Sequence, residues 1–318
     1  MDVFVGIDGG GTKTRAMAVT KDGRLLVDLT AEGSNVNRYG WEPTQRSLSD
    51  LFGKIRAVLK EDEAVVSVYL GLAGIDREQE RQRMNEWVRS QWPDAHVRVG
   101  HDALPALVAA SGESKGIVLI AGTGSIAFGV NEAGETCRVG GWGYLIGDEG
   151  SGYDIGKRAL IAIMRSYDGR GPSTLLTKKI LTRYGLQDVP DLIPLVYSEC
   201  YSRERMAELA RVVMDAALEG DLVSSLLLAD ATVHLCELVE VLLRRLKFES
   251  RQIPLVVTGG LFHPGSMLTE RIRARLEPEV RVVTSKHPPV VGALLLAQQQ
   301  SGKIAAEEFQ QLIRTLEQ

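Results

Sequence analysis

One pattern constrains the fold of this chain more than any other. An apolar strand, a glycine-rich turn and a second apolar strand occur together twice. The two turns are Gly9-Gly10-Gly11-Thr12, between expected strands at residues 3–7 and 15–19, and Gly122-Thr123-Gly124-Ser125, between expected strands at residues 117–121 and 126–130. Short apolar runs joined by glycine turns are typical of β-hairpins. Two halves that open in the same way predict a structural repeat, although their sequences show no obvious identity.

The segments after each hairpin extend both halves into alternating strands and helices. The first half continues with a strand at 25–29, an amphipathic helix after Pro43, a strand at 65–72, a helix at 77–91, a strand at 97–100 and an alanine- and leucine-rich helix. The second half continues with a strand at 136–139, a helical region at about 149–247, strands at 255–257 and 281–283, and a last helical stretch. We expect breaks in the helical region near residues 169–172, 189–190 and 220, where glycine or proline occurs.

This organisation predicts an α/β protein of two domains. A chain of 318 residues accommodates two domains of the usual ~100–200 residues. The polar stretch Gly112–Gly116 marks the boundary, which gives domains at 1–114 and 115–318. A terminal helix at about 304–317 is a candidate for packing back on the first domain.

Glycine is the one unusual residue count. The chain has 33 glycines, and 24 of them fall in residues 1–156. Average usage of ~7% predicts about 22 in all. Glycine permits tight turns and close approach of backbone to a ligand, so the surplus directs attention to the first half of the chain.

The remaining composition excludes several classes of protein. A net charge of −4 does not favour a polyanion, so no nucleic-acid partner is expected. The three cysteines, Cys137, Cys200 and Cys236, are too widely spaced for a disulfide framework or a zinc site and fit buried small hydrophobes of a reducing compartment. The start of the chain lacks a signal-peptide pattern, and no apolar run reaches the ~20 residues of a membrane span. We therefore expect a cytoplasmic protein with no membrane partner.

The first turn is a candidate phosphate site. Backbone N–H groups of a glycine turn can approach an anion, and Thr12 adds a hydroxyl donor. Thr12 separates Gly11 from Lys13, so the spacing of a Walker loop fails, and the dinucleotide fingerprint fails because a strand follows the turn. Asp8, at the end of the first strand, is a carboxylate suited to a hydrated Mg²⁺. A plain tight hairpin remains the alternative.

Four further segments carry candidate site residues. They are the second turn, the glycine-rich segment 140–152, the pair Gly259-Gly260 and the polar loop 32–37. Acids beside exposed backbone in segment 140–152 suit a polyol, although Asp148 or Ser151 could equally cap the following helix. Paired glycines at 259–260 would let a flat ring lie against the backbone, and a plain strand-to-helix turn is the alternative. Asp102, at the end of a strand, is either a helix cap or a general base.

Taken in order, these segments resemble the phosphate-1, catalytic-acid, phosphate-2 and adenosine motifs of the actin/hexokinase/Hsp70 superfamily. The Ser34-Asn35 loop and the segment Gly140–Ser151 narrow the resemblance to the N-acetylglucosamine kinase branch of the BadF/BadG/BcrA/BcrD ATPase family. The resemblance covers nearly the whole chain. It implies two RNase H-like domains with a central cleft, closing over a sugar and MgATP, and a homodimer.

The resemblance also implies roles for individual residues. Asp102 would take the proton from the sugar 6-hydroxyl, and Asp8 would orient the water shell of the metal. The sugar would be bound by Asn35, Val36, Asp102, Gly141, Trp142, Gly143 and Asp148. The nucleotide would be bound by Gly10, Gly11, Thr12, Lys13, Gly122, Thr123, Gly124, Ala207 and Gly260.

The expected activity is therefore ATP-dependent phosphorylation of an amino sugar, with N-acetylglucosamine first among the candidates. Glucosamine or N-acetylmuramic acid are alternative substrates, and a nucleotide-driven activator without a sugar substrate is an alternative class. Activators of the broad family bridge an iron–sulfur cluster with a cysteine pair, and no two cysteines here are near neighbours. The cysteine-rich zinc segment of ROK-type sugar kinases is also missing from the sequence.

Overall fold

The computed structural model describes residues 1–75, 77–263, 265–276 and 278–302. Their contacts divide the chain into two compact units. The first unit comprises Met1–Ser114 together with the described residues from Ser285 onward, and the second comprises Lys115–Thr284. The chain therefore passes between the units twice.

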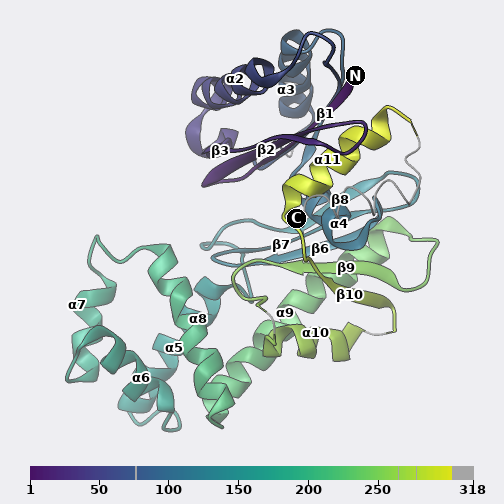
Figure 1. Ribbon diagram of the computed structural model, residues 1–318. Coiled ribbons are helices and arrows are strands. Elements are labelled where there is room, and N and C mark those ends of the chain that lie inside the picture. Colours follow the sequence, from purple (N-terminus) through teal and green to yellow (C-terminus); the bar gives the residue numbers. More distant parts are fainter. Residues whose placement is uncertain (76, 264, 277, 303–318) are drawn as a thin grey trace. The chain divides into compact units, whose positions relative to one another are not determined.

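The first unit contains a five-stranded mixed sheet with helices on both faces (Figure 1). Its elements are β1 (Asp2–Gly9), β2 (Lys13–Thr20), β3 (Leu25–Glu32), α1 (Val36–Tyr39), α2 (Trp41–Val58), β4 (Ala64–Leu72), α3 (Glu78–Gln91), β5 (His96–His101), α4 (Ala103–Ser111) and α11 (Pro289–Gln300). The strand order is β3-β2-β1-β4-β5, in which β1, β2 and β3 are antiparallel while β4 and β5 run parallel to β1.

Alternation along β1 explains why helices cover both faces of this sheet. Val3, Val5 and Ile7 are buried on the face that α2 and α3 cover. Phe4, on the opposite face, packs in a cluster formed mainly by α11. A strand with two buried faces must be apolar nearly throughout, and β1 is.

Helix α11 belongs to the first unit, which corrects the expected boundary of 115–318 for the second domain. It packs against α4, β1 and β4, all of which come from the first 114 residues. Backbone-to-backbone contact makes this possible: a Cβ atom at Gly6 would clash with the backbone of Leu294, and one at Gly292 would clash with the carbonyl oxygen of Pro105. The terminal helix expected at 304–317 lies outside the described residues.

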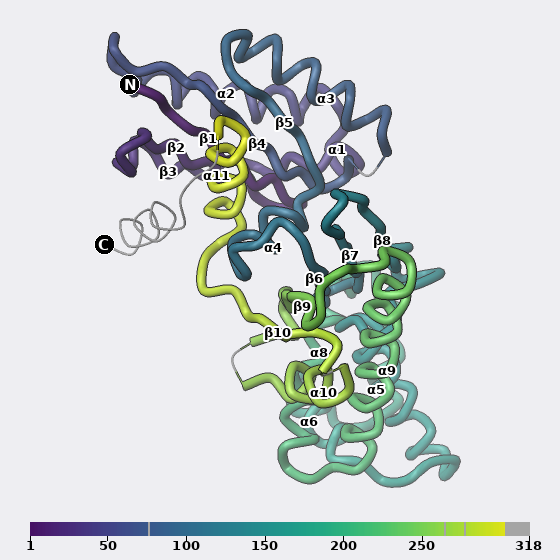
Figure 2. Tube along the Cα trace, turned by 90° about the vertical axis from the view of Figure 1, so that its right-hand side faces the viewer, coloured from purple at the N-terminus to yellow at the C-terminus, as the bar shows by residue number. Residues whose placement is uncertain are grey.

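The second unit repeats the strand order of the first. Its elements are β6 (Gly116–Ala121), β7 (Ser125–Val130), β8 (Thr136–Gly140), α5 (Gly152–Tyr167), α6 (Leu175–Tyr184), η1 (Val189–Asp191), α7 (Leu192–Val196), α8 (Arg203–Leu218), α9 (Leu222–Leu246), β9 (Ile253–Thr258), α10 (Met267–Leu276) and β10 (Val280–Thr284). Read as β8-β7-β6-β9-β10, the sheet has the same pattern of antiparallel and parallel neighbours as the first. Helices α5, α8 and α9 pack on one another, as Figure 2 shows, and share the core with β6 and β9.

The fold confirms the predicted α/β class and most of the expected elements, with local differences. Helix α2 begins at Trp41 rather than after Pro43. A loop separates Gly260 from α10, where we expected the helix to follow directly. Cys200 is exposed, whereas we expected buried cysteines. Within the described ranges, no helix is both long and apolar enough to cross a membrane.

The α11 packing gives a first prediction. Gly292→Ala should lower the free energy of unfolding by about 1–3 kcal/mol, because the added methyl group forces backbone atoms apart in a close-packed site. Urea denaturation measures the change. The matched control is Gly53→Ala in α2, where an added Cβ atom meets nothing within 4 Å. That substitution should be neutral or stabilise by about 0.5–1 kcal/mol through helix propensity. Equal effects of the two variants would contradict the packing argument.

Candidate active site

In the first unit, two acidic residues lie at the carboxyl edge of the parallel strands. Asp8 pairs in register with Gly71 of β4, which in turn pairs with Gly100 of β5. Asp102 follows β5 directly and stands at the start of α4. Ligands in open α/β sheets bind outside this edge, so the topology brings both predicted carboxylates to the expected end of the sheet.

The two carboxylates influence one another. Burial and, next, the negative charge of Asp102 raise the pKa of Asp8 to about 7, while Lys13 and Arg15 act in the opposite direction. Bringing two carboxylates together is unfavourable unless a proton or a cation is shared. A hydrated divalent cation would relieve this repulsion, so the residues present fit the predicted Mg²⁺. Within the described residues no group of three or more acidic, histidine or cysteine side chains could hold a metal by itself. Such a cation would depend on substrate phosphates and water for its other ligands.

The alternative role of Asp102 as a helix cap is not what the structure shows. Its side chain makes no capping hydrogen bond to α4, and its backbone is helical (φ −61°, ψ −22°) rather than extended. Capping residues typically have extended backbone, which aims the side chain at the second or third N–H group of the helix. The carboxylate of Asp102 is therefore not committed to the helix.

The first glycine turn has its carbonyl oxygens bonded to the loop that follows β3. The Ser34 N–H donates to the Gly10 carbonyl at 3.2 Å, and both the Arg38 guanidinium (3.0 Å) and the Tyr39 hydroxyl (2.8 Å) donate to the Gly11 carbonyl. Within the described residues, the N–H groups of Gly11 and Thr12 donate to no protein acceptor. A fixed turn with two available N–H donors is what an anion site requires.

Asn35 has a structural role next to this turn. Its Oδ1 atom accepts from the N–H groups of Asn37 at 2.9 Å and Arg38 at 3.2 Å, and so caps the short helix α1. Val36 is half-buried and packs against the hydrophobic core between the first sheet and helices α2 and α3. The cap fixes the loop that also holds the Gly11 carbonyl, so the predicted sugar loop and phosphate turn form one assembly.

In the second unit, the buried side chain of Asp148 packs against the second glycine turn and accepts a hydrogen bond from it. The Ser125 N–H donates to its Oδ1 atom at 3.3 Å, and a Cβ atom at Gly124 would lie 2.7 Å from its Oδ2 atom. Asp148 is only 8% exposed. Burial raises its pKa, and hydrogen bonds from the Ser125 and Gly143 N–H groups oppose that rise. The helix cap is Ser151, whose side chain accepts from the Asp154 N–H at 3.2 Å.

The second turn resembles the first in its hydrogen bonding. The Gly122 N–H donates to the Gly124 carbonyl at 2.9 Å, and the Gly122 carbonyl accepts from the Gly152 N–H at 2.7 Å. In the part of the chain that the structure describes, the N–H groups of Thr123 and Gly124 donate to no protein acceptor. Each unit thus carries one strand-end turn with two available donors.

Three predicted nucleotide residues of the second unit lie together around this turn. A Cβ atom at Gly152 would be 2.8 Å from the Gly122 carbonyl oxygen and 3.2 Å from the Cβ atom of Ala207. A Cβ atom at Gly122 would be 3.6 Å from the Gly260 nitrogen. The absence of side chains on these glycines lets β6, α5, α8 and the loop after β9 meet. The fold therefore assembles Gly122, Ala207 and Gly260 from distant parts of the sequence.

The loop before α5 presents apolar side chains to solvent. Trp142 is 64% exposed, and Leu145 and Ile146 are each 79% exposed. The Arg138 guanidinium lies 4.7 Å from the centre of the Trp142 ring, a cation–π contact that favours this orientation of the indole. An exposed aromatic ring of this kind suits the apolar face of a sugar.

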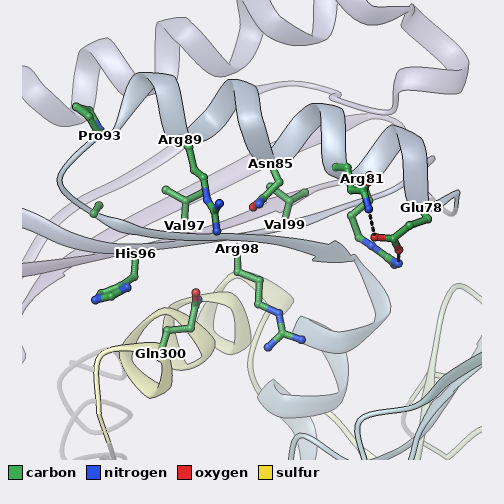
Figure 3. A pocket seen from close by; sticks show the side chains of 12 residues that line it. Glu78, Arg81, Asn85, Arg89, Pro93, His96, Val97, Arg98, Val99 and Gln300 are labelled. Carbon is green, nitrogen blue, oxygen red and sulfur yellow. Dashed lines mark hydrogen bonds and ion pairs between the residues drawn. The ribbon is translucent and has the colours of Figure 1, made fainter.

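Two of the hollows in the described part of the chain lie away from the predicted residues. One, of about 670 Å³, follows the exposed edge of β5 and is lined by Arg81, Arg89, Arg98 and Gln300 among others (Figure 3). The second, of about 840 Å³, is mainly apolar and lies between α5 and α7. Neither is lined by a residue that the sequence assigns to the site. Charged side chains along an edge strand commonly protect it from pairing with other chains.

The sequence also matches a known protein family over most of its length. Residues 5–297 match the model of the BadF/BadG/BcrA/BcrD ATPase family. The chain belongs to that family.

Two relatives cover almost the same length. The chain is 35% identical to the N-acetylmuramic acid/N-acetylglucosamine kinase of Clostridium acetobutylicum and 32% identical to the N-acetyl-D-glucosamine kinase of Dictyostelium discoideum, in each case over 93% of this chain and 98% of the relative. A crystal structure from Chromobacterium violaceum, provisionally named N-acetylglucosamine kinase, is 26% identical with a TM-score of 0.68. That alignment covers 93% of this chain and 99% of the other.

Sequence reasoning missed the residues that hold the first turn. Arg38 and Tyr39 fix the Gly11 carbonyl through side chains from a four-residue helix that we did not expect. Two polar residues capable of capping, Ser34 and Asn35, precede this helix and could have indicated it. Nothing local in the sequence indicates which carbonyl these side chains reach.

The raised pKa of Asp8 gives a second prediction. A carboxyl group that is harder to ionise in the folded state stabilises the fold at low pH, and this contribution is lost as the pH rises toward and through about 7. The free energy of unfolding should therefore fall by about 1–3 kcal/mol more between pH 5 and pH 8 in the wild type than in Asp8→Asn. Asp2→Asn, at the exposed start of the same strand, is the control. Parallel pH profiles for wild type and Asp8→Asn, measured by urea denaturation, would argue against this electrostatic assignment.

Proposed function

We propose that this chain is an ATP-dependent kinase that phosphorylates the 6-hydroxyl group of an amino sugar, with N-acetylglucosamine as the first candidate. The observation that carries the proposal is the pair of glycine turns, at the ends of β1 and β6, each with two N–H groups available to phosphate oxygens. The named activities of the two curated relatives support amino sugars as the substrate class.

The chemistry follows from what each unit offers. Asp102 would accept the proton of the sugar hydroxyl while the hydroxyl oxygen forms its bond to the γ-phosphorus and the bond from that phosphorus to the ADP oxygen breaks. Phosphoryl transfer needs positioning and charge stabilisation more than covalent catalysis. The N–H groups of Gly11, Thr12, Thr123 and Gly124, with the side chains of Thr12, Lys13 and Thr123, would stabilise the phosphate charge. Mg²⁺, when bound with ATP, would neutralise phosphate charge, and Asp8 would hold its water shell.

We assign the sugar contacts to Asn35, Val36, Asp102, Gly141, Trp142, Gly143 and Asp148, and the adenosine contacts to Ala207 and Gly260. Glycines 10 and 122 complete the phosphate turns. The Asp148 carboxylate already accepts backbone hydrogen bonds and is nearly buried. A carboxylate oxygen accepts more than one hydrogen bond, so Asp148 can brace the turn and accept from a sugar hydroxyl together.

We expect a homodimer in the cytoplasm that binds the sugar and MgATP, with no nucleic-acid or membrane partner. The activator class predicts an iron-containing protein after anaerobic purification. Iron-free protein that releases ADP in response to sugar would exclude that class.

A panel of sugars tests the substrate. Purified enzyme with MgATP should release ADP with N-acetylglucosamine, and the product should be the 6-phosphate by NMR. N-acetylmuramic acid is the second candidate, because the 35% identical relative is named for both sugars. Glucosamine tests the need for the acetyl group, and glucose tests the need for the amino group. ADP release that no amino sugar stimulates would overturn the proposed function.

The role of Asp102 gives a third prediction. Asp102→Asn should lower kcat by ~10²–10⁴-fold, because a positioned base contributes about this much to proton transfer. Sugar binding, measured by calorimetry, should persist. Asp94→Asn, an exposed acid just before β5, is the control and should keep wild-type turnover. Turnover within twofold of wild type in Asp102→Asn would remove Asp102 from the mechanism.

A further inference from the structure

His101 is the last residue of β5 and directly precedes Asp102. Its side chain is 10% exposed, and its Nδ1 atom lies 2.9 Å from the Asp102 Oδ1 atom. The same Nδ1 atom accepts a hydrogen bond from the Ala103 N–H at 3.1 Å. One ring nitrogen therefore contacts both the candidate base and the first turn of α4.

These contacts add to the helical backbone of Asp102 in keeping its carboxylate from capping α4. A capping aspartate accepts from the second or third N–H group of the helix, here from Leu104 or residue 105. Residue 105 is proline and has no N–H group. The first N–H group, that of Ala103, is bonded to His101 instead. Of the two usual capping donors only the Leu104 N–H is left, and the helical backbone of Asp102 (φ −61°, ψ −22°) does not aim the carboxylate at it.

The backbone around Asp102 is already fixed by packing. A Cβ atom at Gly71 of β4 would clash with Pro105 and lie 3.4 Å from the Asp102 Cα atom, so β4 and α4 are in contact there. What packing leaves undetermined is the direction of the Asp102 side chain. The remaining freedom is rotation about its Cα–Cβ bond, and the His101 ring lies beside the carboxylate where it limits that rotation.

We propose that His101 is a positioning residue for Asp102, limiting the rotation of its carboxylate and keeping it available to the substrate hydroxyl. The His101 ring caps α4 in place of Asp102 when its Nδ1 lone pair accepts from Ala103, and it donates to the Asp102 carboxylate when Nδ1 carries a proton. The catalytic consequence rests on the proposed function, because it assumes that Asp102 is the base. The placement of the carboxylate does not rest on it.

Three substitutions at His101 distinguish a role in positioning Asp102 from a general role in stabilising the fold. In asparagine, the amide oxygen or nitrogen occupies about the position of Nδ1, whereas in glutamine the amide lies further out, near the position of Nε2. His101→Asn should therefore retain much of the contact, and His101→Gln and His101→Ala should lose it. His96→Ala, an exposed histidine at the other end of β5, is the matched control.

The kinetic expectation is a selective effect on turnover. His101→Ala should lower kcat by about 10- to 100-fold, the cost of a misplaced catalytic group, while KM for ATP stays within about twofold of wild type. His101→Asn should recover at least a third of the wild-type kcat, and His101→Gln should resemble the alanine variant. In the background of Asp102→Asn, His101→Ala should change kcat by less than about twofold, because the two residues act as one unit.

A crystal structure of His101→Ala gives a readout that does not depend on activity. The Asp102 carboxylate should leave its wild-type rotamer or occupy more than one, because the ring that limits its rotation is gone. Failure of every sugar with wild-type enzyme would overturn the proposed function but leave this structural test intact. An unchanged Asp102 rotamer in the alanine variant would overturn the positioning role. So would wild-type kcat in that variant, or equal kcat in the folded asparagine and glutamine variants.

Discussion

The contact between α11 and the first sheet is the constraint on which the first unit depends. Gly6 of β1 lies against Leu294 of α11, and Gly292 of α11 lies against Pro105 of α4. One helix from the end of the described chain thus locks together the strand that carries Asp8 and the helix that begins beside Asp102. Close packing of this kind resists small displacements, so the spacing of the two carboxylates depends on backbone contact rather than on flexible side chains.

Much of the fold follows from local sequence patterns, because each strand–glycine turn–strand unit can be recognised from a stretch of about 20 residues. The structure also shows what many of the surplus glycines do. Those from Gly9 to Gly11 and from Gly122 to Gly124 form the turns. Gly6, Gly152 and Gly292 are sites where two backbone segments approach closely. The second group was not predictable. Which backbone a glycine meets depends on partners far away in the sequence, as between Gly6 and Leu294.

The same distinction holds for the candidate site, where some residues could be predicted from the sequence and others could not. Asp8, Asp102 and both turns could be named from the sequence because strand ends and glycines are visible in it. The roles of supporting groups could not. Asp148 was expected as a sugar ligand or a helix cap, and the structure buries it with its carboxylate bonded to the Ser125 N–H. His101 was not among the predicted site residues, and it contacts the candidate base. Both cases turn on side-chain direction, which spacing along the chain does not encode.

The return of α11 to the first unit also has a consequence for synthesis on the ribosome. Residues 1–114 emerge first, yet most of the cover for the face of their sheet that includes Phe4, Met17 and Tyr69 arrives only with residues 289–300. At ~5–20 residues per second, the intervening stretch takes roughly 10–40 s to translate. During that interval the nascent first unit exposes an apolar surface, and we expect a fragment of residues 1–114 to be sensitive to protease until a peptide spanning α11 is added.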